Sequence, residues 1–157
     1  MITKAETVLP ALDGAMVWIE PDQPVHPLLG IIEALDLAGG RPVLVCPVDH
    51  PFVTTELLTR LAIASAGGQP AVLAAHDGVA EPLLGCYRPA ARPLLLQAMQ
   101  HGPDLNHAVS VLSPALVEVM DPLELFDVNT PDDLLQAAAM LDQQRRQSRA
   151  DQPKVKS

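Results

Sequence analysis

The sequence predicts an α/β fold of three layers, with a mostly parallel sheet between helices. Residues 43–46 and 71–75 are short apolar runs without polar alternation, which is typical of strands covered on both faces. Segments with apolar positions at helical spacing alternate with such runs, and this alternation favours parallel strands joined by helices. A chain of 157 residues, 48% of them hydrophobic, is long enough for one domain with a buried core.

Start and stop signals bound the elements. Two predicted helices end at the glycine pairs 39–40 and 67–68, and two begin at threonines, Thr54 or Thr55 and Thr130. We expect helices at residues 28–38, 54–66, 89–100, 106–112 and 130–141. We expect strands at residues 16–19, 43–46, 71–75, 82–87, 115–119 and 123–128.

The charge of the chain is uneven. The formal net charge is −9, but residues 143–157 hold five basic residues and one acidic residue, so residues 1–142 carry −13. We expect residues 1–142 to form the folded domain and the polar segment 143–157 to be a disordered tail. A body this acidic repels nucleic-acid phosphates, so we expect no nucleic-acid partner. A phosphate ligand would need a divalent cation to neutralise it.

The cysteines and histidines give no metal-binding pattern. Cys46 and Cys86 both lie in apolar runs, and we expect reduced core thiols in a cytoplasmic protein. His26 and His50 each precede a proline and are expected in loops, and His76-Asp77-Gly78 reads as a turn. No segment has the length of a transmembrane helix, so we expect no membrane partner. The sequence also holds neither a G-x-S-x-G nucleophile elbow nor a G-x-x-x-x-G-K-[ST] phosphate loop.

An acid follows the predicted strand 43–46 directly. The apolar run ends at Pro47, and Asp49 lies two residues further on, before the next helix. Open α/β sheets bind ligands just beyond the carboxyl ends of their strands. Asp49 is therefore either a ligand-binding carboxylate or a solvated loop acid, and the stretch alone leaves both interpretations open.

A second polar segment, LFDVNTPDDL (125–134), precedes the last helix. Thr130 suits the N-cap, and Asp133 completes a capping box three residues later, so these residues are assigned to the helix start. Asp127 and Asn129 are not needed for the cap. If they converge with Asp49, the three would form an oxygen-only site suited to Mg²⁺. The sequence does not show by itself that the two segments meet.

Four segments, in this order, resemble those of a known family. HPLLGIIEAL (26–35) resembles a G-P-L-x-G segment with its helix, and VLVCPVDHPF (43–52) resembles a strand with a C/D-x-P-(F/Y) motif. EPLLGCYRPAARPLLLQAM (81–99) resembles an H-P-x-x-x-x-Y segment with its helix, and LFDVNTPDDL resembles the closing (N/D)-x-N-T-P-(E/D)-(E/D)-L. Over roughly residues 16–142 the chain thus resembles the molybdenum cofactor guanylyltransferases (MobA-like), nucleotidyltransferases of GT-A-like fold.

The resemblance implies a GT-A-like (Rossmann-like) nucleotidyltransferase fold and a Mg²⁺-dependent reaction. GMP would pass from GTP to a molybdopterin-type acceptor in molybdenum cofactor biosynthesis, with pyrophosphate released. A molybdoenzyme or maturation partner is implied as well. Asp49 would be the catalytic residue and principal Mg²⁺ ligand, and Asp127 or Asn129 would lie near the metal or the acceptor.

The nucleotide side of the site is only partly matched. By resemblance, Asp22 is the first candidate and Glu20 the second for an acid in the nucleotide pocket, and Gly30 would let the backbone approach the nucleotide. The family normally opens with a strand and a phosphate-binding loop of type L-A-G-G-x-S-x-R-M-G-x-x-K, and this sequence contains no such segment. We therefore expect a fold that lacks its first strand and phosphate loop.

Two alternatives to guanylyl transfer remain open. The acidic body and the missing phosphate loop favour a non-catalytic accessory or binding module in molybdoenzyme maturation. A sister nucleotidyltransferase that uses CTP or a sugar phosphate would show the same motifs. Neither the base preference nor the acceptor can be read from the sequence.

Overall fold

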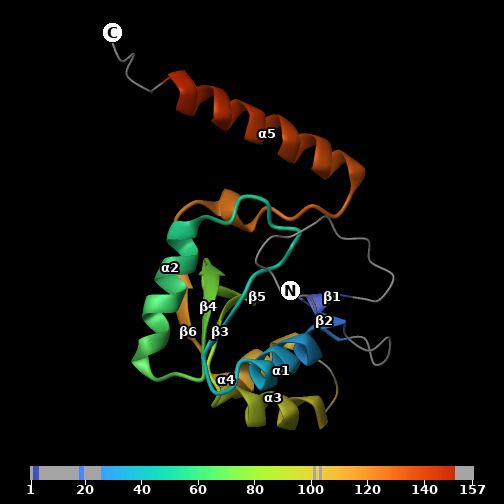
Figure 1. The fold of residues 1–157 in the computed structure, drawn as a ribbon, viewed down its shortest axis with the longest axis vertical. Helices are drawn as coiled ribbons and strands as arrows, with labels where there is room; N and C mark the ends of the chain where they lie inside the picture. Colours follow the sequence, from blue (N-terminus) through green and yellow to red (C-terminus); the bar gives the residue numbers. More distant parts are fainter. Residues whose placement is uncertain (1, 4–17, 20–25, 101, 103, 151–157) are drawn as a thin grey trace.

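A four-stranded sheet forms the centre of the molecule in the computed structural model, which describes residues 2–3, 18–19, 26–100, 102 and 104–150 (Figure 1). Its strand order is β3-β5-β4-β6. The strands are β3 (Val43–Val45), β4 (Ala71–His76), β5 (Val79–Tyr87) and β6 (Ala115–Glu118). A separate parallel pair joins β1 (Ile2–Thr3) to β2 (Trp18–Ile19).

The expectation of a mostly parallel sheet is wrong. In the four-stranded sheet β5 runs antiparallel to both β3 and β4, and β4 pairs in parallel only with β6. The reason is the short connection from β4 to β5, Asp77-Gly78, which closes a hairpin and leaves no room for a crossover helix. Because β5 is reversed against both neighbours, β3, β4 and β6 still share one direction. Their carboxyl ends therefore meet at the same edge of the sheet.

Helices cover both faces of this sheet, as the three-layer prediction requires. One core joins α1 (Pro27–Leu37), α3 (Ala91–Gln100) and α4 (Leu105–Leu112) to Ala71, Leu73 and Tyr87 of the sheet. The other joins α2 (Thr55–Ala64) to Val72, Ala74 and Leu84. Alternate residues of β4 thus enter opposite cores, as the two-residue period of a strand demands. A short 3₁₀ turn, η1 (Ser65–Gly67), follows α2.

Strand β3 is an exposed edge strand rather than one covered on both faces. Within the described sheet it pairs only with β5, and Leu44 is 42% exposed. Cys46 is also exposed, so the prediction of a core thiol is wrong there, whereas Cys86 is buried as predicted. An apolar run alone cannot distinguish a central strand from an edge strand, since both are rich in β-branched residues.

Gly85 of β5 lies very close to the backbone of β4. A Cβ atom at this position would come within 2.5 Å of Leu73 Cδ2 and 2.6 Å of the Val72 carbonyl oxygen. The register of the β4–β5 pair shifts beside it, between Leu73 and Ala74. A side chain is therefore excluded here by backbone approach, a usual reason for glycine inside a strand.

The C-terminal part differs from prediction at two places. Residues 123–128 were expected as a strand, but Pro122–Leu125 form a 3₁₀ turn, η2, and an extended segment follows it. The last helix, α5 (Pro131–Ala150), begins as predicted and continues through residues 143–150, where a fraying end and a tail were expected. Figure 1 shows α5 at the top of the molecule, with α1, α3 and α4 in the lower half. Among the described residues, no helix combines the length and hydrophobicity needed to cross a membrane.

Candidate active site at the carboxyl ends of the strands

Asp49 lies in the loop that follows β3, at the edge where three strands end. Its side chain is 43% exposed, while the neighbouring His50 side chain is only 9% exposed. His50 Nδ1 lies 3.2 Å from Asp49 Oδ1. When that nitrogen carries the proton, His50 donates to the carboxylate and fixes its orientation. The second carboxylate oxygen, Oδ2, then remains to bind a ligand.

The segment that precedes α5 meets the Asp49 loop through the backbone. The Val128 N–H donates to the Asp49 carbonyl oxygen at 2.9 Å, although the two residues are 79 positions apart in sequence. Val128 lies between Asp127 and Asn129, the two polar residues singled out from the sequence. The structure therefore brings into contact two segments whose meeting the sequence left open.

Asp127 and Asn129 form a pair of their own. Asn129 Nδ2 donates to Asp127 Oδ2 at 2.6 Å, which leaves the amide oxygen and the second carboxylate oxygen to act as ligands. The helix start is built separately, because Asp133 Oδ2 accepts from the Thr130 backbone N–H at 2.8 Å and the Thr130 Oγ1 accepts from the Asp133 N–H at 3.2 Å. This reciprocal arrangement confirms the predicted capping box. It also lowers the pKa of Asp133, first through the Thr130 hydroxyl.

Two further contacts clamp the same loops together. The rings of Phe52 and Phe126 pack edge to face, with centroids 5.7 Å apart and planes at 75°. Glu124, only 6% exposed, accepts hydrogen bonds at Oε1 from the Thr54 hydroxyl and from the Thr54 backbone N–H. The loop after β3 and the segment before α5 are thus joined at three points, by these two contacts and by the Val128–Asp49 hydrogen bond.

Sequence reasoning missed Glu124. A buried carboxylate that satisfies a helix N-terminus has a structural role, yet nothing local marks it, because its partner Thr54 is 70 residues away. Thr54 itself was recognised as a helix start, and its hydroxyl does accept from the Leu57 N–H at 3.1 Å. The available signal was a single Glu within an otherwise apolar stretch, PLELF.

Gly30 lies on α1 and lines a groove of about 600 Å³ between α1 and the free edge of β3. Ala34, Leu44 and Val48 line the same groove, and Val48 directly precedes Asp49. A Cβ atom at Gly30 would meet nothing within 4 Å, so packing inside the protein does not require glycine there. The groove thus extends from the Asp49 loop along α1, and Gly30 lies in its wall.

The pKa of the Cys46 thiol is affected by the negative charge of Asp49. Partial burial and, after it, the negative charge of Asp49 both raise the pKa of Cys46, because each disfavours the thiolate. The side chain is nevertheless exposed enough to react with reagents in solution.

Two other predicted residues, Glu20 and Asp22, lie outside the described residues.

The donor chemistry at the loops fits a hard divalent cation. Asp49 and Asp127 offer carboxylate oxygens, and Asn129 offers an amide oxygen; Mg²⁺ prefers such ligands. Asp49 and the Asp127–Asn129 pair also lie on segments joined by a backbone hydrogen bond. The described residues of the site include a partly exposed carboxylate oriented by a nearly buried imidazole, an arrangement able to hold a charged ligand in place.

Comparison with known proteins gives the family. The sequence profile of the MobA-like NTP transferase domain matches residues 1–119. The chain belongs to the MobA-like NTP transferase family. Molybdenum cofactor guanylyltransferases are relatives: that of Rhizobium leguminosarum bv. trifolii is 31% identical over 134 residues, and that of Ectopseudomonas mendocina is 36% identical over 127. These matches cover 74% and 78% of this chain but only 62% and 60% of the relatives, so the chain spans about three fifths of their length.

Solved structures agree with this MobA-like assignment. Molybdopterin-guanine dinucleotide biosynthesis protein A from Archaeoglobus fulgidus superposes with a TM-score of 0.69 at 26% identity, covering 82% of this chain and 69% of that one. A protein from Aquifex aeolicus superposes with a TM-score of 0.64 at 18% identity, covering 74% and 63%, which shows a shared fold alone. The mixed sheet with β5 reversed is therefore an α/β fold structurally similar to that of the MobA-like protein.

Proposed function

We propose that this MobA-like domain binds GTP with Mg²⁺ and transfers GMP to a molybdopterin-type acceptor. The observation that carries the proposal is the Val128–Asp49 backbone hydrogen bond, because it joins the segment that holds Asp127 and Asn129 to the loop that holds Asp49. The names of the relatives, molybdenum cofactor guanylyltransferases, supply the nucleotide and the acceptor class.

In this proposal each residue of the site has a defined task. Asp49 holds the metal through its free carboxylate oxygen, and His50 keeps that carboxylate oriented. Asp127 and Asn129 supply oxygens on the metal or the acceptor side. Bound Mg²⁺ would neutralise charge on the triphosphate. An acceptor phosphate oxygen then attacks the α-phosphorus of GTP in line, and the bond to the leaving pyrophosphate breaks. Catalysis of this kind depends mainly on positioning and charge neutralisation.

The groove beside α1 suits the nucleotide end of the substrate. It is lined mainly by apolar side chains, it begins next to Asp49, and Gly30 opens its wall. A base seated there would place its triphosphate toward the carboxyl edge of the sheet, where open α/β sheets bind their ligands. Asp22 and Glu20 remain candidates for recognition of the nucleotide.

A nucleotide panel tests the reaction directly. The full chain is incubated with Mg²⁺, a molybdopterin-type acceptor and GTP, ATP, CTP or UTP in turn, and released pyrophosphate is measured. The proposal expects release with GTP that requires both the acceptor and Mg²⁺. Release with CTP or with a sugar phosphate as acceptor would indicate the sister nucleotidyltransferase instead. No release with any pair would contradict catalysis by this chain.

One observation favours a second candidate, a non-catalytic module in molybdoenzyme maturation. Among the described residues β3 pairs on one side only and exposes Leu44, and exposed sheet edges commonly accept a strand from a partner. Size-exclusion chromatography with light scattering, with and without an apo-molybdoenzyme, separates the candidates. A complex without pyrophosphate release favours the module, whereas pyrophosphate release by a chain that forms no complex excludes it.

A further inference from the structure

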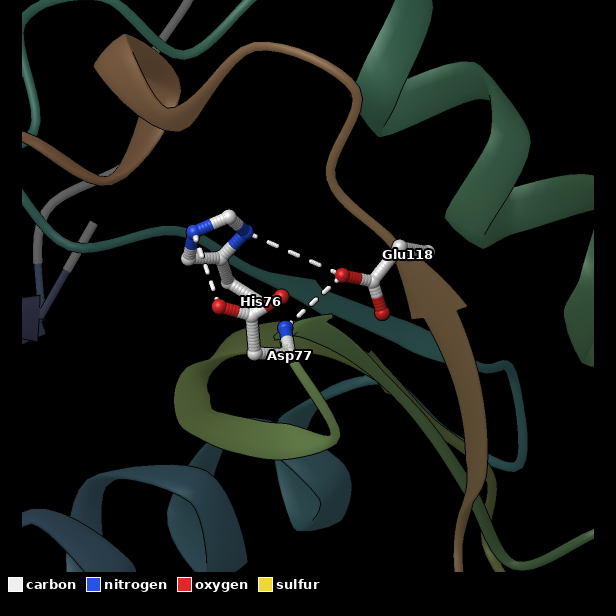
Figure 2. A group of neighbouring side chains, drawn as sticks. All are labelled: His76, Asp77 and Glu118. Atoms are coloured by element: carbon white, nitrogen blue, oxygen red, sulfur yellow. Dashed lines mark hydrogen bonds and ion pairs between the residues drawn. The ribbon is translucent and has the colours of Figure 1, made fainter.

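Three potential metal ligands gather at a second place on the carboxyl edge of the sheet. Figure 2 shows His76, Asp77 and Glu118, with the carboxylates on either side of the imidazole ring. His76 Nδ1 lies 3.7 Å from Glu118 Oε1, and His76 Nε2 lies 3.8 Å from Asp77 Oδ2. One ligand atom from each residue falls within 4.8 Å of the other two.

The imidazole has an unsatisfied nitrogen in this cluster. His76 Nδ1 is buried and has no hydrogen-bond partner, although the ring as a whole is 41% exposed. Its separation of 3.7 Å from Glu118 Oε1 exceeds hydrogen-bonding distance but is close to the spacing of two ligands on one ion. A buried polar atom without a partner costs free energy, and native proteins rarely leave one without a reason.

The backbone fixes the positions of all three residues. His76 ends β4, Glu118 ends β6, and the parallel register of these strands sets Glu118 beside Ala75. The Asp77 backbone N–H donates to Glu118 Oε1 at 2.8 Å, which orients that carboxylate toward the hairpin. Asp77 has a left-handed backbone, φ 50°, uncommon for a residue other than glycine. The two-residue hairpin turn, in which Asp77 and Gly78 both have positive φ, therefore holds Asp77 beside the ring.

We propose that His76, Asp77 and Glu118 form a binding site for a divalent transition-metal ion of the Zn²⁺ class. One imidazole and two carboxylates suit Zn²⁺ better than Mg²⁺, which avoids nitrogen ligands. His76 Nδ1 and Glu118 supply the first pair of ligands, and the exposed Asp77 side chain rotates to complete the set. Tetrahedral ligands lie roughly 3.4 Å apart at zinc bond lengths. His76 Nδ1 and Glu118 Oε1, at 3.7 Å, are already close to that spacing, and the ligand atoms, all within 4.8 Å of one another, need to close by at most about 1.4 Å. Water would fill the fourth position.

This site is distinct from the proposed Mg²⁺ site. Asp49 follows β3, whereas His76 ends β4, and β5 lies between these two strands. Two strand spacings separate them by roughly 10 Å. The proposed Zn²⁺ site therefore does not rest on the nucleotidyl-transfer function, and each of the two proposals can be tested without the other.

The same three side chains could also interact without a metal ion. A protonated His76 would form ion pairs with both carboxylates and need no metal. Arg60 also lies near, since its Nη2 donates to the Glu118 backbone oxygen at 2.8 Å, and its positive charge opposes cation binding. The two carboxylates outnumber this single cation, and a measurement of Zn²⁺ binding distinguishes a metal ion from a bound proton.

Titration of the full chain with Zn²⁺ makes that measurement. We expect isothermal titration calorimetry to show one equivalent bound, and thermal denaturation to show a midpoint that rises with Zn²⁺ concentration because only the folded state carries the site. NMR of the imidazole nitrogens should show His76 Nδ1 shifted on binding. His76→Gln and Glu118→Gln should each weaken Zn²⁺ binding about tenfold or more.

The variants are chosen so that a loss of Zn²⁺ binding can be told from a loss of folding. Glu118→Gln retains an oxygen for the Asp77 N–H, and Asp77→Asn retains a residue that tolerates φ 50°, so both are expected to fold. His107→Gln removes an exposed imidazole elsewhere and should bind Zn²⁺ like the wild type. Wild-type Zn²⁺ affinity in His76→Gln and Glu118→Gln, or no Zn²⁺ binding to the wild type, would overturn the proposal.

Discussion

The backbone N–H of Val128 donates to the carbonyl oxygen of Asp49 at 2.9 Å. This one bond joins the loop after β3 to the segment before α5, and the Phe52–Phe126 contact and the Thr54–Glu124 hydrogen bonds lie on the same two segments. Two motifs that are far apart in sequence thus lie against each other. The stability of this clamp and the chemistry of Asp49 can be tested separately.

Replacing the buried carboxylate should loosen the clamp. Glu124→Gln keeps the size of the side chain but weakens the charge-assisted hydrogen bonds from Thr54, so we expect a loss of roughly 1–3 kcal/mol in the free energy of unfolding. Urea denaturation measures it. Glu33→Gln, which changes an exposed glutamate on α1, is the control and should stay within about 0.5 kcal/mol of the wild type. Equal stability of the two variants would contradict a structural role for Glu124.

A methyl group at Gly85 should damage the sheet. Gly85→Ala places Cβ within 2.6 Å of the Val72 carbonyl oxygen, and backbone cannot yield as a flexible side chain does. We expect destabilisation of about 1–3 kcal/mol by chemical denaturation. Gly67→Ala serves as the control, because a Cβ there meets nothing within 4 Å. If both variants unfolded at the same denaturant concentration, that result would contradict the close approach of β4 and β5 at Gly85.

Gly30→Ala should separate stability from binding. An alanine in α1 has the better helix propensity and meets no neighbouring atom, so the free energy of unfolding should rise by up to about 1 kcal/mol. The added methyl group narrows the groove, so GTP affinity should fall. Calorimetry measures the GTP affinity, and chemical denaturation of the same preparation measures the free energy of unfolding. Unchanged GTP affinity in the more stable variant would exclude Gly30 from the nucleotide site.

The reactivity of Cys46 should report metal binding at Asp49. Burial and the Asp49 carboxylate raise the pKa of Cys46 above its ordinary value of 9.0, so at pH 8 the thiol predominates and alkylation by iodoacetamide is slow. A cation on Asp49 offsets the second cause and lowers the pKa, so Mg²⁺ should accelerate alkylation. Cys86 is buried and should react much more slowly.

Asp49→Asn is the matched control for this reaction. It removes the negative charge, so alkylation of Cys46 should be faster than in the wild type without Mg²⁺ and should no longer respond to Mg²⁺. Peptide mass spectrometry measures the rate at Cys46 alone. An equal acceleration by Mg²⁺ in both proteins would show that the ion acts away from Asp49.

Local signals in the sequence predicted the local structure well. The stop at Gly39-Gly40, the start at Thr54 and the Thr130–Asp133 capping box all appear in the structure, because each depends on residues within one helical turn. The two segments that meet at the Val128–Asp49 hydrogen bond were both singled out from the sequence, since Asp49 and Asp127 each lie beside the boundary of a helix or strand.

Pairing between strands could not be predicted in the same way. The apolar run at β3 gave no sign that it lies at an edge, and the turn at Asp77-Gly78 was recognised without its consequence, the reversal of β5. The hydrogen bonds of Glu124 and Val128 join residues 70 and 79 positions apart. Such contacts depend on how the whole chain packs. The helix and strand preferences of neighbouring residues do not reveal them.

The central claim is that Asp49 binds the metal that accompanies the nucleotide. Its most direct test is calorimetric titration of GTP into the wild type and Asp49→Ala, each with Mg²⁺ and with EDTA, with Asp142→Ala on the exposed face of α5 as the control. We predict Mg²⁺-dependent GTP binding in the wild type and in Asp142→Ala, and its loss in Asp49→Ala. Equal GTP affinity in the wild type and Asp49→Ala would contradict the metal-binding role of Asp49.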